Sequence, residues 1–271
     1  MEMEQVAAKQ VSGTSENLRE LYFQRLHHPD RNPDLDRRLV AAVLEQARRV
    51  IAHPSRPQRH QFLPFNRMPL ADLAIEETLE EAFDLSDPAS LLVEHQEIKP
   101  FSLVAMLDTS SSMSGEKHLL ASIAVAVMLL RIPSKDIGVV TFSSDAKSVK
   151  KLMVSENPAS VVLRFLKASP KGFTNIHIGL KEALGQYEAR GTQRRRLGII
   201  ASDGRSTEGR DPVEVARQFD FLAVIHLQGP GSHRDASIAM AQAGHGIFLE
   251  VEKFEELPSR IYDALRLVSR F

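Results

Sequence analysis

Hydrophobic residues follow two alternating spacings over the last two-thirds of the chain. From Pro100 onward, apolar runs of strand length alternate with stretches whose apolar residues recur at helical spacing. The predicted strands are Ser102–Leu107, Ile137–Phe142, Ala146–Leu152, Leu197–Ser202, Phe221–Leu227 and Gly246–Val251. The predicted helices are Glu116–Leu130, Ala159–Lys167, Asn175–Ala189, Pro212–Arg217, Ala236–Ala243 and Glu255–Val268. This alternation predicts an α/β fold, a doubly wound layer structure with a mostly parallel sheet.

One predicted strand differs from the others. Most are continuous apolar runs, such as Leu103–Leu107, which are typical of a parallel sheet buried on both faces. Ala146–Leu152 is more polar and follows the preceding strand through the turn Ser143–Asp145, which is too short for a parallel crossover. We therefore expect an antiparallel edge strand. Three lysines would protect this edge from pairing with other chains: Lys147, Lys150 and Lys151.

The first 97 residues have a different pattern, with apolar positions at helical spacing and no long apolar runs. The predicted helices are Glu16–His27, Asp36–Ile51 and Ala71–Phe83. Pro88–Glu94 is either a short turn of helix or an extended linker. We therefore expect an N-terminal helical extension over residues 1–97, followed by the α/β domain over residues 98–271.

Composition narrows the classes of partner and chemistry. The formal net charge of −1 gives no electrostatic reason to expect nucleic acid or an anionic membrane as the main partner. The absence of cysteine excludes disulfides, zinc–thiolate sites and cysteine nucleophiles. The N-terminus lacks a basic-then-apolar signal pattern, and the apolar run Leu119–Leu130 is shorter than the roughly 20 residues of a membrane span. We expect a cytoplasmic protein.

Three loops next to the predicted strands and helices are rich in oxygen ligands. They are Asp108–Ser112 after the first strand, Gly172–Thr174 before the Asn175 helix, and Ser202–Gly204 after the Leu197 strand. In open α/β sheets, functional residues gather in loops at the carboxyl ends of the strands. These loops offer two carboxylates and several hydroxyls but no imidazole or thiol. Such hard donors select Mg²⁺, Mn²⁺ or Ca²⁺ over softer metals.

The same three loops resemble the metal-ion-dependent adhesion site of the von Willebrand factor A family. That site begins with an Asp-x-Ser-x-Ser sequence, which is present here with a separate threonine and a later aspartate. The resemblance covers roughly residues 101–271, and all five positions are present: Asp108, Ser110, Ser112, Thr174 and Asp203. The order of strands and helices also matches that family.

The resemblance implies a function as well as a fold. The serine and threonine hydroxyls would bind Mg²⁺, with Mn²⁺ or Ca²⁺ as alternatives, and the aspartates would bind it directly or through water. The sixth position would be left for water or for an Asp or Glu carboxylate of a partner protein. An ion with only two acidic protein groups stays electrophilic toward a further carboxylate. The implied protein is an interaction module and not an enzyme.

Each of these residues also has a plain structural explanation. Asp108, Asp203 or Asn175 could be a helix N-cap, and Ser111 and Ser114 are best interpreted as turn residues. A metal-dependent hydrolase using the same loops is a further hypothesis, but no general base or nucleophile stands at a recognisable position.

Other motifs give weaker indications of function. Arg194–Arg196 is interpreted as a solvated loop, and His27, His28 and His53 lack metal-ligand spacing. The chain has neither a Gly-x-Ser-x-Gly nucleophile elbow nor a phosphate-binding loop of the Gly-Lys-Ser/Thr type. These patterns therefore suggest no second chemistry.

The segment Leu70–Leu79 has a looser resemblance of its own. It is similar to segments that precede the A domain in prokaryotic proteins working beside AAA+ ATPases of the MoxR and magnesium-chelatase kind. This resemblance implies a MoxR-type AAA+ ATPase as partner. The alternative is a non-catalytic subunit of a metal-chelatase or metal-cofactor insertion complex. The extension could also simply pack on the A domain and cover one face of it.

Overall fold

The chain forms two compact units in the computed structural model. One unit combines residues 1–53 with residues 100–271, and the other comprises residues 54–99. The structure describes residues 17–27, 32–52, 61–64, 72–73, 92–95, 102–188 and 195–268. The first unit contains the candidate site.

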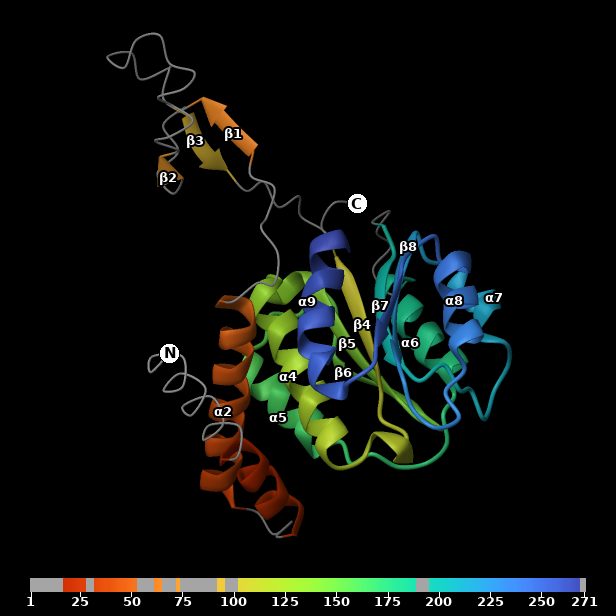
Figure 1. Ribbon diagram of the computed structural model, residues 1–271, viewed down its shortest axis with the longest axis horizontal. Coiled ribbons are helices and arrows are strands. Elements are labelled where there is room, and N and C mark those ends of the chain that lie inside the picture. Colours follow the sequence, from red (N-terminus) through yellow and green to blue (C-terminus); the bar gives the residue numbers. More distant parts are fainter. Residues whose placement is uncertain are drawn as a thin grey trace, which may run out of the picture. The chain divides into compact units, whose positions relative to one another are not determined.

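A six-stranded sheet forms the centre of the first unit (Figure 1). Its strands, in spatial order, are β6 (Ala146–Lys150), β5 (Ile137–Phe142), β4 (Leu103–Asp108), β7 (Leu197–Ser202), β8 (Phe221–Leu227) and β9 (Phe248–Val251). All neighbouring pairs are parallel except β5 with β6, which are antiparallel. The predicted doubly wound sheet with one antiparallel edge strand is confirmed.

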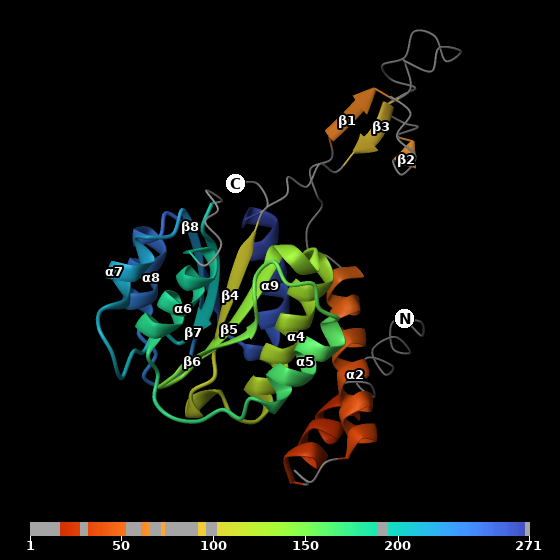
Figure 2. The same cartoon turned by 180° about the vertical axis from the view of Figure 1, so that it is seen from behind.

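Helices cover both faces of this sheet (Figures 1 and 2). One face packs against α4 (Glu116–Arg131), α5 (Pro158–Lys167) and α9 (Leu257–Val268). The other packs against α6 (Ile176–Glu188), α7 (Pro212–Ala216) and α8 (Arg234–Ala243). Because side chains alternate along a strand, β4 sends Leu107 into the first core and Met106 into the second.

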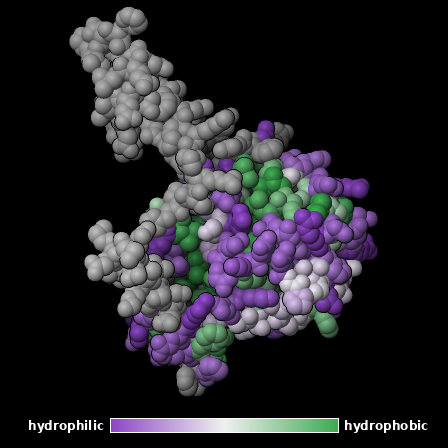
Figure 3. Space-filling view, viewed as in Figure 1, coloured by the Kyte–Doolittle hydropathy of each residue, from purple (hydrophilic) through white to green (hydrophobic). Residues whose placement is uncertain are grey.

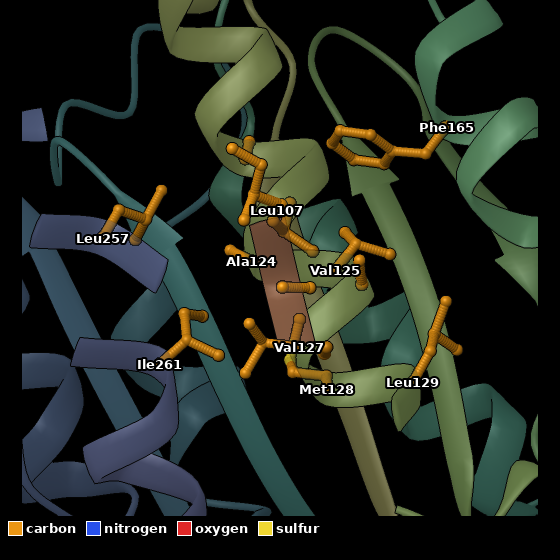
Figure 4. Close-up of a cluster of buried hydrophobic side chains, with 14 of the residues drawn as sticks. Leu107, Ala124, Val125, Val127, Met128, Leu129, Phe165, Leu257 and Ile261 are labelled. Atoms are coloured by element: carbon orange, nitrogen blue, oxygen red, sulfur yellow. The ribbon is translucent and has the colours of Figure 1, made fainter. Parts of the chain in front are cut away.

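The core on the α4 side is built from interlocking aliphatic and aromatic side chains (Figure 4). Leu107 from the sheet, Val125 of α4, Phe165 of α5 and Ile261 of α9 are all buried members of this one cluster. Eleven of the sixteen residues of α4 are buried, because α4 has helices beside it as well as the sheet beneath it. The run that contains Leu119–Leu130 is therefore a core helix, as the sequence predicts.

Two N-terminal helices form an outer layer over α4, α5 and α9. A helix over residues 17–27 and α2 (Pro33–Ala52) contribute buried residues such as Tyr22 and Leu39 to the same core. Arg25 links them through an ion pair with Asp36, and it also donates to the backbone oxygen of Leu166 in α5. The presence of helices before the sheet is confirmed.

The second unit contains a three-stranded antiparallel sheet. Its strands are β1 (Gln61–Pro64), β3 (Leu92–His95) and β2 (Asp72–Leu73), in that order. The predicted helix over Ala71–Phe83 is wrong at Asp72–Leu73, where the backbone pairs with β3, and the rest of that prediction lies outside the described residues. Short apolar runs are compatible with both the helical and the strand spacing of apolar residues, and here pairing with β3 makes the segment a strand.

Lys150 does not play the predicted role at the sheet edge. Its side chain is only 1% exposed, and its ammonium donates to the backbone oxygens of Ser134, Ile137 and Val154. The chain beyond β6 lies against the segment that precedes β5, where Met153 N bonds to the backbone oxygen of Lys135, and Lys150 is enclosed between the two segments. Lys147 and Lys151 are exposed, as the edge prediction requires.

The surface shown in Figure 3 is largely hydrophilic, with smaller hydrophobic areas between the charged side chains. Within the described part of the chain, no helix combines the length and the apolar character needed to cross a membrane.

Candidate metal centre

The chain reverses its winding direction between β4 and β7. After β4 it enters α4 on one face of the sheet, and after β7 it continues toward α7 on the opposite face. Connections that leave neighbouring parallel strands in opposite directions open a crevice at the carboxyl ends of those strands. Asp108 is the last residue of β4, and Asp203 follows the last residue of β7. Both carboxylates therefore belong to the position where α/β folds bind ligands.

Asp108 is held in one orientation by hydrogen bonds from two loops. Its side chain is 1% exposed. Ser110 N donates to Asp108 Oδ1 at 2.8 Å, and Ser202 Oγ donates to Asp108 Oδ2 at 3.0 Å. Ser202 Oγ in turn accepts from Gly204 N at 3.2 Å. Ser202 therefore fixes the β4 carboxylate from the neighbouring strand.

The electrostatics at Asp108 are unfavourable for its charged form. The pKa of this carboxyl is raised to about 6, mainly by burial and to a smaller extent by the negative charge of Asp203, although hydrogen bonds from Ser110 and Ser202 lower it. Among the residues that the structure describes, no basic side chain forms an ion pair with Asp108 or Asp203. A buried carboxylate without a counter-charge is costly, so a bound cation would stabilise it.

The serine hydroxyls of the first loop lie next to this carboxylate. A single turn of 3₁₀ helix, η2 (Ser111–Met113), begins directly after Ser110 and turns the chain so that Ser110 Oγ and Ser112 Oγ are 3.0 Å apart. Ser110 is buried and Ser112 is exposed. The pair therefore spans the distance from the buried carboxylate to the surface, and it provides the hard hydroxyl donors that Mg²⁺ prefers.

Thr174 comes from the second loop and is 5% exposed. Its backbone N donates to Thr207 Oγ1 at 2.9 Å, and its backbone oxygen accepts from Thr207 N at 2.8 Å. Ser110, Ser112, Thr174 and Asp203 line one open hollow of about 390 Å³, together with Thr207 and Glu208. Four of the five residues predicted for the metal site thus meet in one hollow, and the fifth, Asp108, is hydrogen-bonded to one of them.

The first two loops are tied together by backbone contacts. Ser111 donates to the backbone oxygen of Gly172 through its backbone N at 3.2 Å and through its Oγ at 3.1 Å. Lys171 N donates to the backbone oxygen of Thr109 at 3.0 Å. Gly172 has φ +78°, and a Cβ there would lie 2.9 Å from Ser144 Oγ, so the turn requires glycine. The loops are therefore preorganised beside each other.

The capping alternatives have different outcomes. Asn175 Oδ1 accepts from Ile178 N at 3.2 Å, so that Asn175 caps α6. Asp203 Oδ1 accepts from Arg205 N at 2.9 Å within a local turn and does not cap a helix, and the N-cap of α4 is Gly115. Asp108 therefore accepts a hydrogen bond from the loop that follows it and caps no helix.

The sequence does not single out some residues that act at the site. Ser202, which bonds to Asp108, and Thr207 and Arg205, which line the hollow, have roles that depend on contacts between loops. The described residues hold no cluster of three or more histidine, aspartate or glutamate side chains arranged for a metal. An ion in the hollow would therefore depend on hydroxyl donors.

Comparison with known proteins identifies the domain. Residues 103–205 match the model of the von Willebrand factor type A domain family. No curated protein sequence matches the chain. The fold is similar to that of an aerotolerance-related membrane protein from Bacteroides fragilis, with 16% identity, a TM-score of 0.51, and coverage of 63% of this chain and 100% of that chain.

Two further solved structures share the fold at low identity. Proximal thread matrix protein 1 from the mussel byssus, with a zinc-occupied MIDAS motif, is 20% identical with a TM-score of 0.52, over 61% of this chain and 47% of that one. A von Willebrand factor type A protein from Catenulispora acidiphila is 14% identical with a TM-score of 0.51, over 66% and 44%. The chain thus spans less than half of either protein. Residues 103–205 thus match the von Willebrand factor type A domain family, and the six-stranded fold that contains them is shared with these solved structures.

Proposed function

We propose that this chain is a metal-dependent protein interaction module that binds an acidic residue of a partner protein. One observation carries the proposal. The buried Asp108 forms no ion pair with the other described residues, and it accepts a hydrogen bond from Ser110 N, whose residue lines the open hollow. A divalent cation there would supply a positive charge to a partner carboxylate. The chain itself would fix the cation and leave one side open.

The division of labour among the proposed ligands follows from burial. Ser110 and Thr174 are buried and would contact the cation from below, whereas Ser112 is exposed and would contact it at the rim. Asp108 and Asp203 would compensate its charge, directly or through water. Because only two carboxylates take part, a net positive charge would remain to attract an Asp or Glu from outside. The preferred ion in this proposal is Mg²⁺, with Mn²⁺ and Ca²⁺ as alternatives.

The kind of partner is proposed from the sequence resemblance of Leu70–Leu79. We propose a cytoplasmic assembly in which a MoxR-type AAA+ ATPase, or its client, presents the acidic residue. A role as the non-catalytic subunit of a metal-chelatase or metal-cofactor insertion complex is the alternative. In both cases this chain is not itself an enzyme.

The test is binding to a MoxR-type AAA+ ATPase, measured in Mg²⁺ and in chelator. Asp108→Ala and Ser110→Ala should each weaken the binding at least tenfold, and chelator should weaken it to the same extent. Ser114→Ala is the matched control, because this exposed hydroxyl lies just beyond η2 and, among the described residues, bonds only to the backbone oxygen of Ser111. Unchanged binding in both site variants and in chelator would refute the proposal.

The chelatase alternative is separated by reconstitution. The ATPase would be assayed for metal insertion with and without this chain, using the wild type and Asp108→Ala. Insertion that requires the chain would favour the chelatase role. ATPase binding without any insertion activity would favour the adaptor role. The chain alone should neither bind nor hydrolyse ATP.

A further inference from the structure

An exposed aromatic side chain stands at the rim of the candidate metal centre. Phe173 is 62% exposed, more than any other large hydrophobic residue in the described part of the chain, and it lines the same hollow as Ser110 and Thr174. Exposing a phenylalanine to this degree forgoes the burial that would stabilise it in a core. Aromatic residues are enriched at protein–protein interfaces, and Phe173 lies beside the residues proposed to bind a partner through the metal.

The loop holds Phe173 in place. Phe173 N donates to Ser144 Oγ at 3.0 Å, and the residues on either side are fixed as well. Gly172 accepts two bonds from Ser111, and Thr174 exchanges backbone bonds with Thr207. The aromatic ring is therefore carried by a loop whose backbone is already ordered. Binding to such a side chain costs less conformational entropy than binding to one on a loose loop.

The charge around Phe173 favours an acidic partner segment. Arg205 lines the hollow, is exposed, and forms no ion pair with the other described residues. Lys171 is exposed two residues before Phe173. These two cations accompany the proposed metal ion, and the acidic residues that line the hollow are Glu208 and the proposed ligand Asp203. The hollow thus offers a positive centre with one aromatic edge.

We infer that the partner presents an acidic residue with an apolar residue directly beside it in sequence, and that this apolar side chain packs on Phe173. The inference rests on the proposed metal-dependent function. Phe173 is adjacent to the proposed ligand Thr174, and consecutive Cα atoms are about 3.8 Å apart. Neighbouring residues of the partner have this same Cα spacing. The residue next to the bound Asp or Glu can therefore lie beside Phe173 while the carboxylate lies beside Thr174. A carboxylate contact and an apolar anchor then form together.

The probe is a peptide array of the form Gly-Gly-X-Asp-Z-Gly-Gly, with X and Z each varied over all residue types. The full-length chain is applied in millimolar Mg²⁺ and in chelator. We expect binding to require the central Asp, to fail when Asn replaces it, and to be strongest where X or Z is aromatic or aliphatic. Phe173→Ser should weaken binding to the apolar-flanked peptides by roughly five- to thirty-fold and leave the glycine-flanked Asp peptide unchanged.

Val154→Ser is the matched control. Val154 is also exposed, at 37%, but it lies beyond β6 near the amino end of β5, whereas the site lies at the carboxyl ends of β4 and β7. The Val154→Ser variant should bind every peptide as the wild type does.

Different failures have different meanings. Mg²⁺- and Asp-dependent binding that ignores the flanking residues, or that Phe173→Ser leaves intact, would overturn this inference while the proposed function stands. Equal loss in Phe173→Ser and Val154→Ser would overturn it as well. Loss of any dependence on Mg²⁺ and on the central Asp in the wild type would refute the proposed function, and this inference with it.

Discussion

The hydroxyl of Tyr22 lies 3.1 Å from Nδ1 of His118, and this buried contact joins the helix over residues 17–27 to α4. The His118 ring also stacks on Phe165 of α5, with ring centroids 4.9 Å apart. Nε2 of His118 has no hydrogen-bond partner among the described residues. The outer helical layer is therefore attached to the domain through a histidine that is buried in its neutral form.

This histidine should make the folded state sensitive to acid. Burial lowers the pKa of His118 from 6.5 to about 4, so the unfolded chain takes up a proton at a higher pH than the folded chain does. Its contribution to stability is complete above pH 6.5 and is lost as the pH falls toward 4. At pH 5 the loss should reach about 2 kcal/mol.

Urea unfolding at pH 7 and pH 5 measures this loss. A Tyr22→Phe/His118→Leu double variant, which removes both partners of the contact, should lose less free energy of unfolding between the two pH values than the wild type. An equal loss in both proteins would show that His118 does not titrate as described.

Asp108 should have the opposite pH dependence when no metal is bound. The pKa of its carboxyl is raised by burial from 3.8 to about 6, so its protonated form stabilises the folded state below pH 3.8, and this stabilisation disappears as the pH rises through 6. In chelator at pH 7.5, Asp108→Asn should therefore unfold with a free energy up to about 3 kcal/mol higher than that of the wild type.

Addition of Mg²⁺ should reverse the order. The wild type should gain thermal stability with rising Mg²⁺ concentration, as expected for a ligand that binds only the folded state, and Asp108→Asn should gain little. Thermal melts over a series of Mg²⁺ concentrations measure both effects. A variant that is less stable than the wild type in chelator would contradict the assigned cost of the buried charge.

Two exposed serines, Ser112 in the first loop and Ser114 just beyond it, should differ in their effect on Mg²⁺ affinity. Ser112→Ala removes a proposed ligand and should lower the Mg²⁺ affinity roughly tenfold, whereas Ser114→Ala should leave it within a factor of two. Isothermal titration of each variant with Mg²⁺ makes the comparison. Equal affinities in the two variants would remove Ser112 from the ligand set.

Lys150 should be far more important for stability than its neighbours on the same strand. Lys150→Ala leaves the backbone oxygens of Ser134, Ile137 and Val154 without their ammonium donor, inside the fold. We expect the free energy of unfolding to fall by about 3 kcal/mol or more. Lys147→Ala, an exposed control, should change it by less than about 0.5 kcal/mol. Similar urea midpoints for both variants would contradict the structural role of Lys150.

The strands of the six-stranded sheet are predictable from the sequence because a strand that is buried on both faces is a continuous run of apolar residues. The bounds of β5, β7 and β8 are those that the apolar runs predict, since strands covered on both faces need continuous apolar residues. β2 could not be found this way. It has two residues, and its strand character comes only from pairing with β3.

The candidate site is predictable in its residue types but not in its contacts. Asp108 and Asp203 are recognisable because carboxylates directly follow apolar strands. The bond from Ser202 to Asp108 crosses from β7 to β4, and the exposure of Phe173 contradicts the ordinary expectation that an aromatic residue is buried. Both follow from how the loops meet. That the five residues bind an ion together stays a prediction, as does the division of the chain at residues 97 and 98.

The segment of residues 54–99 interrupts the sequence of the larger unit, whose two parts lie before and after it. The ends of such an insertion are fixed by its host, and the entropic cost of joining them grows only with the logarithm of the length between them. Doubling that length would cost about 0.6 kcal/mol. Variants that shorten, extend or exchange this insert should therefore leave the host almost as stable as before, so that the insert is free to diversify.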